Sequence, residues 1–147
     1  MKTVFDKETR DELISRINKL SDNSTARWGQ MNAYQMIRHC TLWEKMVQDR
    51  KLYKRMFIGL IFGRMALKSI TKDETPLGQN TPTIPDLKIT GNGNVSDEKA
   101  NWIARIREYA NYTDQVFIHP FFGKMTKEQV GYLAYKHSDH HLRQFNS

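Results

Sequence analysis

The segment TKEQVGYLAYKHSDHHLRQ, from Thr126 to Gln144, decides the expected fold. Its apolar side chains recur every three or four residues, which is the period of one face of an α-helix. Thr126 and Gln129 stand in the N-cap and N3 positions of a capping box, so we expect the helix to begin there. These apolar side chains form a stripe along the helix, and His137 and His141 continue the same stripe toward its end. The sequence therefore predicts a helix whose inward face brings two imidazoles into the protein interior.

Three more segments show the same period, at about residues 6–20, from Asn32 onward, and at about 96–112. Asn32 and Gln35 form a second pair with capping-box spacing. Ser96 is the expected N-cap of its helix, because two acidic residues follow it in the first turn. We see no strand alternation that competes with these helices.

The segment from about Tyr53 to Lys68 is also predicted to be helical, although two glycines weaken it. Residues 69–95 are rich in proline, glycine and asparagine, so we expect one long loop. Ile84 and Leu87 are the residues expected to pin this loop to the helices. The sequence thus predicts an all-α four-helix bundle with a long crossover loop and an extra helix, as a single domain over residues 1–147.

The composition sets further limits on the class of protein. The chain has 147 residues, of which 39% are hydrophobic and 27% charged, as in a globular domain and not in a disordered chain. A single cysteine, Cys40, excludes a disulfide within the chain and a cysteine-built zinc site, and we expect it to be a small buried apolar residue. The early acidic residues do not fit a standard secretory signal, so a cytoplasmic location is expected.

His137 and His141 are four residues apart, so on a helix they differ by about 40° in direction and by about 6 Å in height. Two histidines at this spacing can bind one metal ion. His39 lies beside the apolar stripe of the helix that follows Asn32, and could approach the pair from a facing helix. Three imidazole ligands would leave a coordination position open for water or substrate. The alternative is that these histidines are surface residues or hydrogen-bonded core residues.

Other residues near the predicted ligands have weaker assignments. Gln35, Trp43 and Gln144 are close to them by helical spacing and are candidates to line a pocket, although Trp43 fits a core position better. His140 is expected at the edge of the helices, where it would support the ligands or face solvent. His119, which precedes a proline, is expected to hydrogen-bond within a loop.

No general base stands out in the sequence. Glu44 and Asp139 are the acids nearest to the predicted ligands, and we expect both to be solvated. Tyr109 and Tyr112 could donate protons, but they fit the boundary of their helix better.

Four segments carry a resemblance to a known family: WGQM (28–31), QMIRHC (35–40), HPFFGKMT (119–126) and HHLRQ (140–144). Together they resemble an uncharacterised bacterial family of the DinB-like (YfiT-like) superfamily. The resemblance implies a four-helix bundle with a metal site formed by His39, His137 and His141. Superfamily members are similar to metal-dependent hydrolases and to transferases that use low-molecular-weight thiols. Many bind nickel, zinc, iron or manganese, and many are dimers, so a homodimer remains open.

Two functions follow as expectations. The first is a metal-dependent enzyme, a hydrolase or a thiol-dependent transferase, that acts on a small molecule of unknown identity through zinc, nickel or iron. The alternative is a non-catalytic metal- or small-molecule-binding module that acts as a dimeric interaction protein. The resemblance does not choose between them, because the family it points to has no established activity.

The charge is unevenly distributed. Lys and Arg number 23 and Asp and Glu 16, and residues 50–72 contain seven of the basic residues and no acid. The apolar run MFIGLIF at 56–62 lies inside this segment and is far shorter than the ~20 residues of a membrane span, so no stable membrane insertion is expected. The segment could lie on an anionic membrane, contact nucleic acid or form a dimer interface. We expect instead that Phe57, Ile58, Ile61 and Phe62 cover the bundle or a second subunit. Nucleic-acid binding is not expected, because no recognised motif accompanies the charge.

Overall fold

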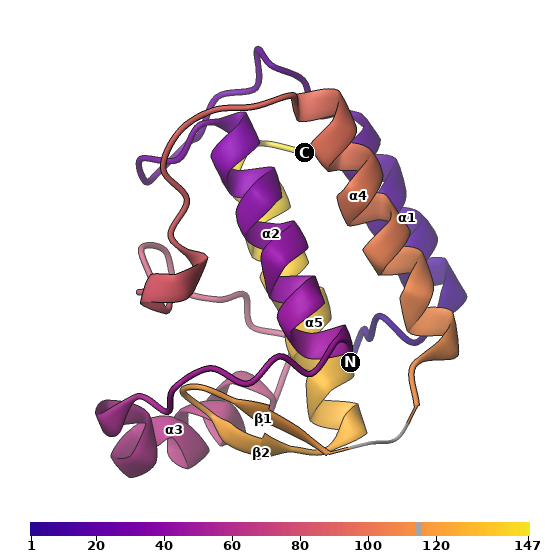
Figure 1. Ribbon diagram of the computed structural model, residues 1–147. Helices are drawn as coiled ribbons and strands as arrows, with labels where there is room; N and C mark the ends of the chain where they lie inside the picture. The colour runs from indigo at the N-terminus through magenta and orange to yellow at the C-terminus, as the bar shows by residue number, and fades with distance from the viewer. Residues whose placement is uncertain (114–115) are drawn as a thin grey trace.

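The computed structural model describes residues 1–113 and 116–147 (Figure 1). Within them the protein is mostly helical, as predicted. The elements in chain order are α1 (Lys7–Asn18), α2 (Ala33–Gln48), α3 (Phe57–Ile70), the 3-10 turn η1 (Pro85–Leu87), α4 (Val95–Glu108), the 3-10 turn η2 (Tyr109–Asn111), β1 (Phe117–His119), β2 (Gly123–Met125) and α5 (Lys127–Gln144).

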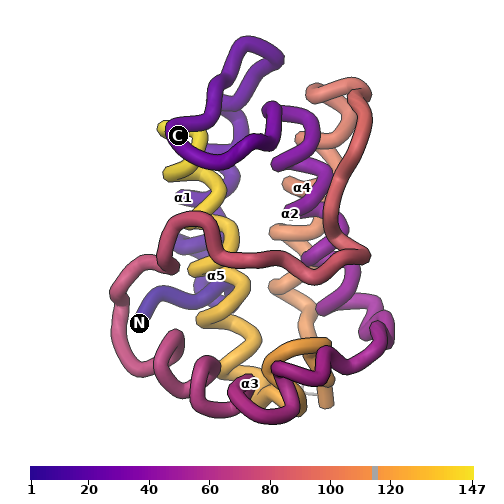
Figure 2. The backbone as a smooth tube through the Cα atoms, turned by 90° about the vertical axis from the view of Figure 1, so that its left-hand side faces the viewer, coloured from indigo at the N-terminus to yellow at the C-terminus, as the bar shows by residue number. Residues whose placement is uncertain are grey.

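Four of the helices surround a common core. α2 packs against α4 and α5, and α1 packs against the same two helices (Figures 1 and 2). Many core side chains come from the predicted stripes, and Leu13 is among the largest that are fully buried. Trp102 and Tyr109 are also fully buried, although the sequence did not assign them to the core. This packing places the inward faces of α2 and α5 against each other.

The helix starts follow the local capping chemistry. Both predicted capping boxes are present: the Asn32 side chain accepts from the Gln35 N–H, and the Thr126 hydroxyl accepts from the Gln129 N–H. The prediction that Ser96 caps α4 is wrong. Asn94 is the N-cap, and its Oδ1 accepts from the Asp97 N–H at 3.0 Å. Asparagine caps as well as serine, so the helix begins one residue before Ser96.

The crossover between α3 and α4 is anchored at both of the predicted residues. Ile84 and Leu87 are buried, and the 3-10 turn η1 that carries Leu87 packs on α2. Figure 2 shows this segment running across α5 and α2. Lys136 of α5 holds the start of the crossover, because its Nζ donates to the backbone carbonyls of Ile70, Asp73 and Thr75.

A short antiparallel hairpin was not predicted. β1 and β2 pair Phe117 with Met125 and His119 with Gly123. Each strand has only three residues, which is too few for an alternating pattern to stand out from the sequence. The hairpin also explains where α3 begins. The Met56 N–H donates to the Pro120 carbonyl, so the chain from Tyr53 to Met56 runs outside the helix.

The expectation that Phe57, Ile58, Ile61 and Phe62 cover the helical body is wrong for this chain, since all four are exposed. The buried face of α3 consists of Gly59, Gly63 and Leu67. A second subunit that would cover the apolar residues stays a prediction. Among the described residues, no helix has the length and apolar character needed to cross a membrane.

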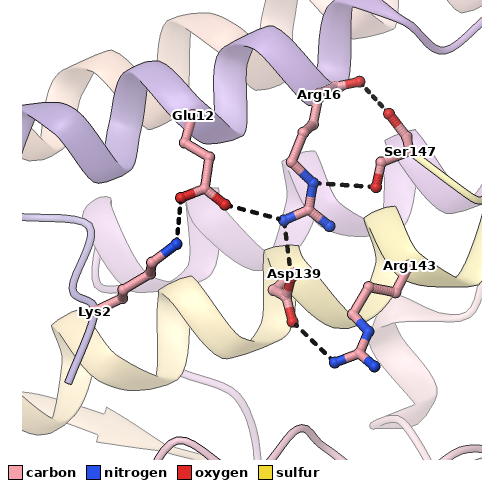
Figure 3. A network of polar contacts seen from close by, with 6 residues as sticks. All are labelled: Lys2, Glu12, Arg16, Asp139, Arg143 and Ser147. Carbon is pink, nitrogen blue, oxygen red and sulfur yellow. Dashed lines mark hydrogen bonds and ion pairs between the residues drawn. The ribbon is translucent and has the colours of Figure 1, made fainter.

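Asp139, expected to be a solvated acid, is instead only partly exposed and forms an ion pair. Figure 3 shows it facing Arg16 of α1, whose Nη1 donates to the Asp139 carboxylate at 2.8 Å. The same guanidinium donates from Nε to the Ser147 carbonyl at 3.1 Å. Asp139 therefore joins α5 to α1, on a different face of α5 from the predicted metal ligands, and Arg16 also joins α1 to the last residue.

Candidate metal centre

Three histidines from two helices lie together, as predicted. His39 comes from α2, and His137 and His141 come from successive turns of α5. Their candidate ligand atoms all lie within 4.8 Å of one another, so the three side chains could hold one metal ion. His39 and His141 are buried and His137 is partly buried. The expectation that imidazoles from two separate stretches of chain converge is confirmed.

The orientation of the His39 ring is set by the crossover. His39 Nδ1 lies 2.9 Å from the carbonyl oxygen of Leu87, the buried residue of the turn η1. A carbonyl oxygen can only accept, so the hydrogen of a neutral His39 is on Nδ1 and the lone pair is on Nε2. Nε2 is the atom that faces His137.

The orientation of the His141 ring is set by Gln144. His141 Nδ1 lies 2.8 Å from Gln144 Oε1, and Gln144 Nε2 donates to the Trp28 carbonyl at 2.8 Å. The second bond fixes the direction of the amide, so Oε1 is the acceptor and His141 Nδ1 carries the hydrogen. The Nε2 lone pair of His141 is thereby free for a ligand role. Histidines that bind metals are commonly held in this way through their other nitrogen.

The third ring, His137, is positioned by stacking. The ring of Trp43, which follows His39 by one turn of α2, stacks on the His137 ring. The ring centroids are 4.5 Å apart and the interplanar angle is 19°. His137 Nε2 is 3.1 Å from His39 Nε2, while its Nδ1 is buried without a hydrogen-bond partner in the described part of the chain. Trp43 is thus both a core residue, as favoured from the sequence, and a wall of the site.

The spacing of the His39 and His137 nitrogens fits a shared cation. Two ligands at 2.0–2.1 Å from a tetrahedral zinc ion lie about 3.3 Å apart. The observed separation of 3.1 Å between the two Nε2 atoms is close to this value. The donor set also fits, because neutral imidazole suits zinc, nickel and iron. These residues could therefore hold a divalent transition metal, and nothing in them selects which one.

Burial keeps all three rings neutral. It lowers the pKa of His39, and it lowers the pKa of His137 well below the usual histidine range, with a further contribution from His141. Burial, together with the nearby His39, lowers the pKa of His141 to about 3. At neutral pH each ring therefore offers a lone pair instead of a positive charge, which is the form that a metal requires.

The other residues singled out from the sequence divide into two groups. Gln144 contacts the histidine cluster through His141, as described above. The His140 ring lies next to the cluster, with its centroid 5.0 Å from that of the His141 ring and 5.8 Å from that of the Trp28 ring. Gln35 serves the helix cap instead: its Oε1 accepts from the Asn32 N–H and its Nε2 donates to the Gly91 carbonyl.

Two further expectations are confirmed away from the cluster. His119 Nδ1 accepts from the N–H groups of Phe121 and Phe122, so His119 closes the hairpin turn. Cys40 is fully buried, with its Sγ 3.8 Å from the sulfur of Met36. Neither residue belongs to the candidate site.

Glu44 corrects the expectation of a solvated acid, because it is fully buried. The Tyr109 hydroxyl donates a short hydrogen bond to its carboxyl group, and the Ser138 hydroxyl donates another at 3.3 Å. Burial raises the pKa of Glu44 to about 8, although both hydrogen bonds act in the opposite direction. The sequence held a signal for this burial: Glu44 is four residues after Cys40 and three before Val47, on the edge of the apolar stripe.

Replacing Glu44 by glutamine is expected to change how stability depends on pH. The folded-state pKa of about 8 lies above the usual 4.5, so between these values the folded protein holds a proton that the unfolded chain releases. The stabilisation is complete below pH 4.5 and is lost as the pH rises through 8. In this window the free energy of unfolding of the wild type should fall by about 1.4 kcal/mol per pH unit relative to Glu44→Gln. Urea denaturation of both proteins from pH 5 to 8 measures the difference, and parallel profiles would contradict it.

Comparison with known proteins identifies the family of this chain. The family model described as "Protein of unknown function (DUF1569)" matches residues 2–147. No curated protein and no solved structure matches the chain.

Proposed function

We propose that this chain, which belongs to the DUF1569 family of proteins of unknown function, is a metal-dependent enzyme. His39, His137 and His141 would hold one divalent transition metal ion, with zinc, nickel and iron as the candidates. The substrate would be a small molecule, and the reaction either a hydrolysis or a transfer to a low-molecular-weight thiol. We further propose that α1, α2, α4 and α5 form a four-helix bundle of the DinB-like kind. The extra helix α3 and the long crossover that follows it would together connect α2 to α4.

One observation carries the proposal. Two buried Nε2 lone pairs, on His39 and His141, are held toward the same space by acceptors on the far side of each ring, Leu87 O and Gln144 Oε1. A neutral imidazole lone pair is the form that a metal ion binds, so one divalent cation in that space could accept both of them. A site held by three protein ligands also keeps a position open, which is the pattern of catalytic and not of closed structural sites.

The protein residues supply orientation and protection around that position. Gln144 ties His141 to the Trp28 carbonyl, so the ring cannot rotate away from the cluster. The Trp43 face shields His137 on one side. A bound divalent cation would lower the pKa of a water or thiol at the open position toward neutrality. A water there would favour hydrolysis, and a thiol would favour transfer.

The test is turnover by the protein with and without metal. Tag-free protein is stripped with a chelator, reloaded separately with Zn²⁺, Ni²⁺ and Fe²⁺, and assayed on panels of esters, amides and electrophiles with and without small thiols. We expect activity that is lost on stripping and regained on reloading, whereas reloaded His39→Ala stays inactive. A requirement for thiol would identify a transferase.

His119→Asn is the matched control, since it removes a buried imidazole outside the cluster and keeps an acceptor for the hairpin N–H groups. It should retain the activity of the wild type. Full activity in His39→Ala would remove the metal from the mechanism.

A further inference from the structure

The outward side of α3 is an apolar surface that none of the described residues covers. We define the α3 face as Phe57, Ile58, Leu60, Ile61, Phe62 and Met65, whose side chains are between 47% and 78% exposed. At 100° per residue, Ile61 and Met65 point directly away from the glycines on the buried side of the helix. A continuous apolar patch of this size on a single chain normally marks a binding surface.

The glycines make this orientation unavoidable. A Cβ at Gly59 or Gly63 would lie 2.4 Å or 2.1 Å from the carbonyl oxygen of Phe121, so only glycine lets α3 approach the hairpin this closely. Arg64 adds a second attachment, because its Nη1 donates to the Lys124 carbonyl at 2.6 Å. The helix is therefore held with its six apolar side chains outward instead of turning them to the core.

Positive charge surrounds the α3 face. Residues 50–72, which include α3, contain no acid. The exposed cations among them are Lys51, Lys54, Arg64, Lys68 and Lys72, of which Lys72 lies 3.8 Å from the Asp73 carboxylate. At the same end of the molecule, α3 lies beside the hairpin (Figures 1 and 2). An open hollow of about 1210 Å³ adjoins it, where Arg55, Arg64, Lys124 and Lys127 outnumber one acid, Glu128.

We propose that the α3 face docks on the surface of an anionic phospholipid bilayer, with its apolar side chains between the headgroups and the cations of its rim against lipid phosphates. The helix of 14 residues is about 21 Å long, which suits an element lying in the plane of the interface. The described helices include none that could cross the bilayer. The proposed contact is one in which α3 lies in the interface.

The charge pattern favours a bilayer over a second copy of the chain. In a symmetric dimer the same patch faces itself, so the cations of one rim would meet the cations of the other. Like charges brought together at an interface oppose association, whereas anionic headgroups complement them. Polybasic segments gain binding to anionic membranes from each lysine or arginine near the surface.

The experiment measures co-sedimentation of the full chain with vesicles of equal parts phosphatidylglycerol and phosphatidylcholine, and with vesicles of phosphatidylcholine alone. Each is measured at about 50 mM and about 500 mM NaCl, between which the Debye length falls about threefold. We expect at least tenfold stronger partitioning onto the anionic vesicles, and weaker binding in the higher salt. Ile61→Glu/Met65→Glu alters two exposed side chains and should lower the partitioning at least tenfold without changing the melting temperature.

Two double lysine variants separate local charge from net charge. Lys68→Gln/Lys72→Gln removes two cations from the rim of the α3 face, and Lys19→Gln/Lys88→Gln removes two exposed cations elsewhere. Only the first pair should weaken binding. The proposal fails if the wild type does not bind the anionic vesicles in low salt, or if the glutamate variant binds as the wild type does. It also fails if sedimentation velocity shows a dimer that the glutamate variant turns into a monomer, since a second copy then covers the face.

Discussion

Changing His141 to alanine is expected to lower the affinity of the protein for divalent transition metal by more than 100-fold. The substitution removes a buried Nε2 lone pair, and it leaves Gln144 Oε1 without the N–H that it accepts. Loss of an outer hydrogen-bond partner alone typically costs 10- to 100-fold in metal affinity, so loss of a ligand should cost more. Titration of tag-free protein with Zn²⁺ and Ni²⁺ against a competing chelator measures the change.

His119→Asn again serves as the control and should bind metal as the wild type does. The wild type should also gain stability from metal, by about 2.7 kcal/mol at a free metal concentration 100 times the dissociation constant, and His141→Ala should gain almost none. Thermal melts with and without metal test this difference. Equal metal content in His141→Ala and in the wild type, by elemental analysis, would contradict a three-histidine site.

The double substitution Gly59→Ala/Gly63→Ala is expected to destabilise the protein by about 2 to 5 kcal/mol, because both new methyl groups overlap backbone atoms. Each Cβ would fall within 2.4 Å of the Phe121 carbonyl oxygen, and a backbone oxygen in a paired hairpin cannot move aside cheaply. In an open helix the same change would stabilise by up to about 1 kcal/mol per site, since alanine is the better helix former. The sign of the effect therefore tests the contact.

Urea denaturation gives the global free energy, and hydrogen exchange of the α3 amides shows whether the helix detaches locally first. Gly78→Ala is the matched control, because its Cβ would meet only the Thr81 hydroxyl at 3.9 Å. This change should stay within about 0.5 kcal/mol of the wild type. A stabilised double variant would mean that α3 does not rest on the hairpin as described.

Local patterns in the sequence were enough to predict most of the helices. The capping boxes at Asn32 and Thr126 join residues three apart, and such bonds form in the same way wherever the helix lies in the protein. The His137–His141 pair follows from the same helical period. The error at Ser96 was small for the same reason: Asn94 caps by identical chemistry, and the choice between neighbouring cap residues depends on where the crossover enters the helix.

Contacts between distant residues decided what the sequence left open. His39 meets His137 across 98 residues and Leu87 across 48, and Glu44 meets Ser138 across 94. A three-residue strand carries too little pattern to predict, and the exposure of Phe57 and its neighbours depends on a backbone that only glycine can approach. The sequence by itself determined where most of the helices lie and which two imidazoles share a face of one helix, because these depend on interactions within one or two turns. The tertiary structure alone decided where their lone pairs point, which acid is buried and which apolar face is left outside, because those depend on how separate segments pack.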